Sequence, residues 1–256
     1  ILFASEPKAL FAAGWRADAD PRALDHVMAF GYGPPDGGAF ERLKSLPPGH
    51  LAVWQDGNLQ VRPYWSWEPA PHKVPIGGLL EHVENVLEEA VRIRLVSERP
   101  LGAFLSGGID STIVTALMAR HHSGPVKTFS IGFTDPAYDE SRHARRVADY
   151  LGSDHTELIV EPDPVTMLSR LAEVFDQPFS DSSAIPTLML SELAAKDVVV
   201  ALSGDGGDEG FGGYDRYRAA PTLQRLNSLL GIAQPFGGLA ALLADKAGQR
   251  RLGRLA

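Results

Sequence analysis

The eleven residues from Leu101 to Ser111, LGAFLSGGIDS, constrain the fold of this 256-residue chain more than any other segment. The apolar and small residues of Leu101–Leu105 predict a short buried strand, and two glycines then allow a sharp turn. Ser106, Asp110 and Ser111 place polar groups at the start of the helix that follows. Free backbone N–H groups at a helix start attract anions. The segment therefore predicts a phosphate-binding loop between a strand and a helix.

The loop belongs to neither of the two commonest nucleotide-binding patterns. The chain contains no G-x-x-x-x-G-K-[ST] sequence and no G-x-G-x-x-G sequence. An ordinary Gly-Ser turn after a strand is one alternative. The pattern S-G-G-x-D-S resembles the pyrophosphate loop of the ATP pyrophosphatase superfamily, whose members cleave ATP between its α and β phosphates.

A second motif, SGDGGDEGFGGY, runs from Ser203 to Tyr214 and follows the apolar segment Asp197–Leu202. Its acidic residues are Asp205, Asp208 and Glu209. A loop rich in carboxylates and glycine suits Mg²⁺, whereas the spacing of a calcium loop is absent. A solvated acidic turn is the alternative. Together with Ser106–Ser111, this motif resembles the signature of the asparagine synthetase C-terminal domain.

Strands and helices alternate along the chain from Leu101 onward. We expect strands at 101–105, 126–131, 155–160 and 197–202, and helices at 110–121, 139–151, 164–175 and 185–196. This alternation predicts an α/β fold with a parallel sheet flanked by helices. The family resemblance implies an adenine nucleotide α-hydrolase-like arrangement. Ligands bind such sheets at the carboxyl ends of the strands, so the two loops can converge on one nucleotide.

Residues 1–64 read as an incomplete α+β segment. We expect a strand at Ile1–Ala4, a short helix at Glu6–Ala13 and a helix that Asp20 caps before Pro21. Asp56-Gly57 predicts a hairpin turn between two strands. The runs Phe3–Leu10 and Leu46–His50 resemble the closing part of a class II, N-terminal-nucleophile glutaminase domain. We expect the chain to be a fragment that lacks the earlier part, with its nucleophilic cysteine.

A proline-rich run, Trp65–Pro75, predicts a stiff linker at 65–77 between two domains. Apolar residues at helical spacing then predict an amphipathic helix: Leu79, Val83, Val86, Leu87, Ala90 and Val91. We assign residues 78–256 to an ATP-binding synthetase domain truncated at its C-terminus. Lys246 is not assigned to the lysine that the family carries in its later segment.

Composition excludes several classes of function. The net charge of −8 disfavours nucleic acid as a partner. The longest apolar runs are far shorter than the roughly 18 residues of a membrane span. Without cysteine the chain forms no disulfide and no thiolate metal site. We expect a cytoplasmic enzyme that acts on small molecules and a possible homodimer.

The charge of ATP implies a divalent metal. ATP carries about four negative charges, and a helix start offsets only about 0.3–1 kcal/mol per exposed anionic group. The acidic loop would add further negative charge beside it. We therefore predict that Mg²⁺ links Asp110 and Asp208 to the pyrophosphate oxygens. In the family that the chain resembles, the matching aspartates hold Mg²⁺.

The resemblance also implies roles for the other residues of the site. Phosphates would lie on the loop formed by Ser106, Gly107, Gly108, Asp110 and Ser111. Adenine would contact the backbone of Leu105 and Ile131, and ribose would lie near Ser203 and Gly204. Asp205 would be the catalytic acid–base group, because ammonium must lose a proton before it attacks. Simple strand core is the alternative for Ile131, and ordering of glycine N–H groups is the alternative for Asp205.

The resemblance implies a reaction in which ATP adenylates a carboxylate, pyrophosphate leaves, and ammonia from glutamine attacks the acyl-adenylate. The segment Phe175–Pro186 is similar to part of the acid-substrate pocket, and we expect aspartate as the acceptor. Pro178, Phe179 and Asp181 stand where synthetases carry a Thr and an Arg. Relatives of the β-lactam synthetase and lasso-peptide cyclase type adenylate other carboxylates. Another pyrophosphatase-type ligase and a non-catalytic nucleotide-binding module are the remaining alternatives.

Overall fold

The computed structural model describes residues 1–16, 18–34, 37–68, 75–135, 139–161, 163–215, 217 and 219–222. The chain divides into two compact units, Ile1–Ser203 and Gly204–Ala256. Residues 69–74 of the predicted linker lie outside the described residues, as does the end of the predicted synthetase domain with Lys246.

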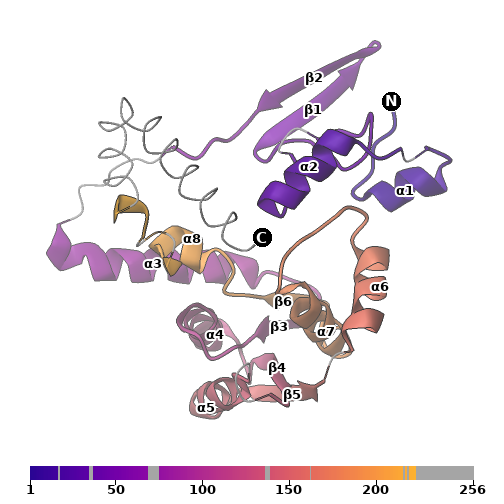
Figure 1. The fold of residues 1–256 in the computed structure, drawn as a ribbon. Coiled ribbons are helices and arrows are strands. Elements are labelled where there is room, and N and C mark those ends of the chain that lie inside the picture. Colours follow the sequence, from indigo (N-terminus) through magenta and orange to yellow (C-terminus); the bar gives the residue numbers. More distant parts are fainter. Residues whose placement is uncertain are drawn as a thin grey trace, which may run out of the picture. The chain divides into compact units, whose positions relative to one another are not determined.

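A four-stranded parallel sheet forms the centre of the first unit (Figure 1). Its strands, in the order β5-β4-β3-β6 across the sheet, are β5 (Asp154–Val160), β4 (Lys127–Phe133), β3 (Leu101–Phe104) and β6 (Val200–Leu202). In register, Phe104 of β3 lies beside Phe129 of β4, and Ala103 lies beside Leu202 of β6. The predicted α/β fold with a parallel sheet flanked by helices is confirmed.

Helices cover both faces of this sheet, as Figure 1 shows for α4 and α5 on one side and α7 on the other. The helices of this part are α3 (Ile76–Arg94), α4 (Ile109–His121), α5 (Ser141–Leu151), α6 (Pro164–Val174) and α7 (Ala184–Ala194). Local sequence sets their ends. Asp163 accepts N–H bonds from Val165 and Thr166 at the start of α6, and Gly152, with φ +64°, ends α5.

Alternate side chains of the strands point to opposite faces, which gives the core two sides. Ala103 of β3 packs with Val91 of α3 and with Leu117 and Met118 of α4. Phe129 of β4 is buried on the other face with Leu193 and Ala194 of α7. The predicted amphipathic helix buries only its carboxyl-terminal half, because Leu79 and Val86 are about half exposed.

The predicted strand at 197–202 is shorter in the structure, where β6 begins only at Val200. The N–H groups of Asp197 and Val198 both donate to the carbonyl oxygen of Ala194, at 3.0 and 2.9 Å. These residues therefore close the end of α7 and cannot pair with β3. The other predicted strands and helices from 101 to 196 are found within two residues of their expected bounds.

The amino-terminal part contains α1 (Pro7–Ala12), α2 (Pro21–Phe30) and an antiparallel hairpin of β1 (His50–Gln55) and β2 (Asn58–Pro63). Both turn residues of the hairpin have positive φ, 51° at Asp56 and 78° at Gly57, as a type I′ turn requires. The predicted Asp20 cap is confirmed, since its side chain accepts the Arg22 N–H at 2.9 Å.

The prediction of a strand at Ile1–Ala4 is wrong. These residues form no strand, and Phe3 is 91% exposed. An apolar run becomes a strand only where a neighbour pairs with its backbone, and no described strand lies beside it.

Across the described ranges, no helix is long and apolar enough to cross a membrane.

A half-buried histidine joins β4 to β5. His155 Nδ1 lies 2.9 Å from Thr128 Oγ1, and its Nε2 lies 3.1 Å from Ser130 Oγ. Both hydroxyl residues are buried, on the face of β4 opposite Phe129. Burial lowers the pKa of His155 below its ordinary value, and this effect outweighs the opposing carboxylates of Glu157 and Asp149.

This histidine predicts a pH dependence of stability. Below about pH 6.5 the unfolded chain binds a proton at His155 that the folded protein does not bind, so the free energy of unfolding falls as the pH is lowered. His155→Gln should flatten the profile between about pH 7 and 5, measured by urea unfolding. The exposed His122→Gln is the control and should keep the wild-type profile. Equal profiles for wild type and His155→Gln would contradict the lowered pKa, because they would mean that folding does not change proton binding at this ring.

Candidate active site

The turn after β3 requires glycine at position 107. Gly107 has φ +81°, and a Cβ there would lie 2.5 Å from the carbonyl carbon of His143 and 2.6 Å from Ala144 N. Both atoms are backbone at the start of α5, so neither can move aside cheaply. The turn therefore runs directly against α5, and any other side chain would force it outward.

Two serine hydroxyls hold the loop together from within. Ser106 Oγ lies 3.0 Å from Ser111 Oγ, and Ser106 Oγ accepts the N–H of Gly108 at 3.2 Å. Ser111 is buried and donates to the carbonyl oxygen of Gly108 at 3.3 Å, whereas Ser106 lies at the surface. No side chain caps the start of α4. The loop thus presents a hydroxyl and the uncapped end of a helix, a combination that suits an anion.

The residues expected to contact adenine and ribose lie at the carboxyl edge of adjacent strands. Leu105 is buried and donates its N–H to Phe129 O at 2.9 Å, and Ile131 follows two positions later on β4. Ser203 follows Leu202, which is paired with Ala103. The structure therefore brings Leu105, Ser106, Ile131 and Ser203 to one edge of the sheet. Ile131 is half-buried, so its side chain also packs in the strand layer.

The acidic loop opens the second unit, where Asp205 is exposed on a turn and α8 spans Gly207–Phe211. Gly206 has φ +94°, and Gly207 N–H donates to Gly204 O at 3.2 Å. Asp208 and Glu209 both lie in the first turn of α8.

Two contacts fix these acids locally. A Cβ on Gly213 would overlap Asp208 Oδ1, and Gly213 N–H donates to Asp208 O at 3.0 Å. Tyr214 OH donates to Glu209 Oε1 at 2.7 Å. Glu209 thus serves the shape of the loop, while Asp208 lies half-buried beside a glycine that leaves it room.

In the described part of the chain, no group of three or more histidine, aspartate or glutamate side chains is arranged to hold a metal ion. Asp110 is half-buried in the first turn of α4 in the first unit, and Asp208 belongs to the second unit. A Mg²⁺ ion bound with a nucleotide takes one or two carboxylates together with phosphate oxygens and waters. Each of these two loops offers a carboxylate of the kind that such an ion takes.

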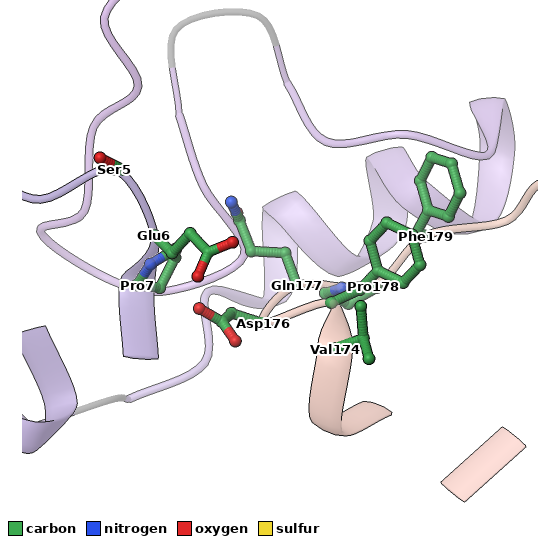
Figure 2. Close-up of a pocket in the computed structure, with 9 residues that line it drawn as sticks. Ser5, Glu6, Pro7, Val174, Asp176, Gln177, Pro178 and Phe179 are labelled. Carbon is green, nitrogen blue, oxygen red and sulfur yellow. The ribbon is translucent and has the colours of Figure 1, made fainter. Parts of the chain in front are cut away.

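The segment expected to form the acid-substrate pocket connects α6 to α7 and contacts the start of the chain. Asp176 and Gln177 line an open hollow of about 360 Å³ together with Glu6 and Pro7, as Figure 2 shows. Asp181 Oδ1 accepts the backbone N–H and the hydroxyl of Ser183 at 2.8 and 2.7 Å. These hydrogen bonds lower the pKa of Asp181 and keep its carboxyl ionised. The sequence held no signal for the contact with residues 6 and 7.

Protein-family models match both parts of the chain. Residues 82–256 match the model described as asparagine synthase, and residues 1–65 match a glutamine amidotransferase domain. The chain belongs to the asparagine synthase family. The resemblance inferred from the two loop motifs is therefore confirmed.

Curated relatives agree with this family. The chain is 32% identical to asparagine synthetase [glutamine-hydrolyzing] 1 of Bacillus subtilis over 88% of its length and 36% of the relative's. It is 33% identical to a putative asparagine synthetase [glutamine-hydrolyzing] 2 of Methanocaldococcus jannaschii over 94% of its length and 50% of the relative's. The chain thus spans about a third to a half of these relatives. An NH3-dependent NAD synthetase structure from Campylobacter jejuni aligns with a TM-score of 0.37 and 15% identity over 52% of this chain and 60% of that one.

The Gly107 turn yields a test of the loop geometry. Gly107→Ala should lower the free energy of unfolding by about 1–3 kcal/mol, because it combines a positive φ with backbone overlap. Gly124→Ala is the matched control, since nothing lies within 4 Å of a Cβ there and its φ is not positive. It should change stability by less than about 0.5 kcal/mol. Guanidinium unfolding measures both, and equal effects would contradict the close approach of the loop to α5.

Proposed function

We propose that this chain carries the ATP-binding site of an asparagine-synthetase-type ligase. ATP adenylates a carboxylate and releases pyrophosphate, and ammonia then attacks the acyl-adenylate to give an amide and AMP. The observation that carries the proposal is the glycine turn before an uncapped α4, at the same sheet edge as Ser203. Family membership supports the reaction class, and the names of the relatives support glutamine as the ammonia source.

The nucleotide would lie across the edge of β4, β3 and β6. Its phosphates would meet the backbone and hydroxyl groups of the Ser106–Ser111 loop, where Gly107 and Gly108 expose the main chain. Adenine would contact the backbone of Leu105 and Ile131, and ribose would lie near Ser203 and Gly204. The short separation of neighbouring parallel strands, about 4.8 Å, suits a ligand that spans them.

Mg²⁺ would be held by Asp110 and Asp208 together with phosphate oxygens. When bound, the ion neutralises part of the phosphate charge beside the acidic loop. The half-buried position of both aspartates supports this assignment, since each keeps part of its side chain within reach of solvent and ligand. The uncapped α4 start then adds a smaller electrostatic contribution from its N–H groups.

Asp205 is proposed as the acid–base group. An ammonium ion must lose a proton before its nitrogen lone pair can attack the acyl carbon, and a carboxylate at this place can take that proton. Asp205 is exposed on the turn that precedes α8. The competing role is ordering of the glycine backbone around it.

Aspartate is the acceptor that we propose. The curated relatives are asparagine synthetases, and this supports aspartate. Pro178, Phe179 and Asp181 occupy the segment where synthetases carry a Thr and an Arg, which favours another carboxylate of the β-lactam synthetase or lasso-peptide cyclase type as the second candidate. The cytoplasmic location and the homodimer stay predictions.

The metal assignment has a direct test. Asp110→Asn and Asp208→Asn should each abolish Mg²⁺-dependent pyrophosphate release in the intact protein while the circular dichroism spectrum stays unchanged, because both residues lie on loop-facing first turns and neither is fully buried. Glu98→Gln, an exposed carboxylate outside these loops, is the control and should keep wild-type release. Wild-type turnover in either aspartate variant would remove that residue from the metal site.

Asp205 is tested by separating binding from chemistry. Asp205→Asn keeps shape and hydrogen-bonding capacity, so ATP affinity should change by less than about 1 kcal/mol. The rate should fall by about 10²–10⁴-fold, the usual loss for an acid–base group. Equilibrium ATP binding is measured beside pyrophosphate–ATP exchange and amide formation. If binding collapses together with exchange, Asp205 is a structural acid, and if only amide formation stops, it acts in the ammonia step.

A further inference from the structure

A partly exposed ion pair ties the start of the chain to the connection between α6 and α7. The backbone N–H of Lys8 donates to Asp176 Oδ2 at 2.6 Å, and the Lys8 ammonium lies 3.4 Å from Asp176 Oδ1. The Asp176 side chain is only 7% exposed, whereas the Lys8 side chain is 45% exposed. The Lys8 ammonium also donates to Val174 O at 3.1 Å. Lys8 therefore binds both the end of α6 and the residue that starts the connection.

Two further hydrogen bonds join the same connection to the amino-terminal part. Ala39 N–H donates to Gln177 Oε1 at 2.9 Å, and Ser180 N–H donates to Gly31 O at 3.2 Å. A Cβ on Gly38 would lie 2.9 Å from Gln177 Oε1, so the glycine allows the two segments to approach. The connection from 176 to 180 is thus held at three points by residues that match the glutamine amidotransferase model.

The topology places the far end of this connection near the nucleotide edge. Val199 N–H donates to Pro100 O at 3.0 Å, so the chain leaves α7 at the amino edge of the sheet, just before β3. Because α7 ends at the amino edge and its last turn packs on Phe129 of β4, α7 runs along the sheet in the direction opposite to the strands. Its eleven residues span about 16 Å, which brings its start, at Ser183, toward the carboxyl edge.

We propose that Lys8 is a positioning residue for the acceptor carboxylate. Through Asp176, it fixes the segment 176–183 at the carboxyl edge, so that the part of the chain that matches the amidotransferase model controls adenylation as well as ammonia supply. This inference rests on the proposed function. The Glu6 carboxylate, 3.4 Å from the Lys8 ammonium, adds a second and more exposed partner. A displacement of about 1 Å in a positioned reactant costs up to about a hundredfold in rate. A small shift of this segment after loss of the ion pair is therefore enough to change the rate measurably.

The experiment is aspartate-dependent pyrophosphate–ATP exchange in the intact protein. Lys8→Met should raise the KM for aspartate on the order of tenfold, while the KM for ATP changes by less than about twofold. Lys8→Arg keeps the charge and should restore most of the loss. Asp176→Asn should act in the same direction, and the double variant should be no worse than Asp176→Asn alone, because both changes remove one interaction.

The control is Lys127→Met, which removes a comparable lysine, paired with Asp197 at 3.7 Å and located at the first residue of β4. It should leave both KM values unchanged. An unchanged KM for aspartate in a folded Lys8→Met, an equal rise for aspartate and ATP, or additive losses in the double variant would overturn the inference. Should Lys8→Met not fold, Asp176→Asn carries the test because it keeps the side-chain shape. Wild-type protein without exchange would overturn the proposed function, and the inference with it.

Discussion

The parallel pairing of β3 with a strand on each side is the constraint on which the remaining structure depends. Phe104 lies beside Phe129 of β4, and Ala103 beside Leu202 of β6. This pairing brings the carboxyl ends of three strands to one edge of the sheet. The Gly107 turn, Ile131 and Ser203 therefore lie at that edge. It also divides the core, because neighbouring residues of β3 pack on opposite helical layers. The position of the proposed phosphate loop thus depends on strand order as much as on loop sequence.

An ion pair and hydrogen bonds join the amino-terminal part to the connection between α6 and α7. A carboxylate as buried as Asp176 is costly without a partner, and Lys8 supplies both a backbone N–H and an ammonium. Removing the Lys8 ammonium leaves the buried Asp176 carboxylate with one partner fewer, whereas the exposed Lys8 stays solvated without Asp176. The hydrogen bonds of Gln177 and Ser180 then extend this contact along the connection into α7. The family match across both parts is consistent with a contact of this kind.

The sequence predicted the helix caps and turns that neighbouring residues determine. It missed the features that depend on contacts between residues far apart in the chain. Asp20, Pro21, Asp56 and Gly57 carry strong cap and turn preferences, so the helix and the hairpin that they bound were predicted correctly. The strand at Ile1–Ala4 failed because strand formation needs a pairing neighbour. The contacts of Lys8 with Asp176 and of His155 with Thr128 and Ser130 join residues far apart in sequence, where composition and spacing carry no signal. The site roles themselves came from the two loop motifs.

The fate of the carboxylate oxygen tests most directly the claim that ATP adenylates the acceptor carboxylate. The intact protein is given ATP, ammonium and aspartate labelled with ¹⁸O in its side-chain carboxylate, and the products are analysed by mass spectrometry. Attack of the carboxylate on the α-phosphate, followed by attack of ammonia on the acyl carbon, leaves one labelled oxygen in AMP. The account predicts labelled AMP together with unlabelled pyrophosphate. Formation of ADP with label in inorganic phosphate would contradict it, because the carboxylate would then have attacked the γ-phosphate.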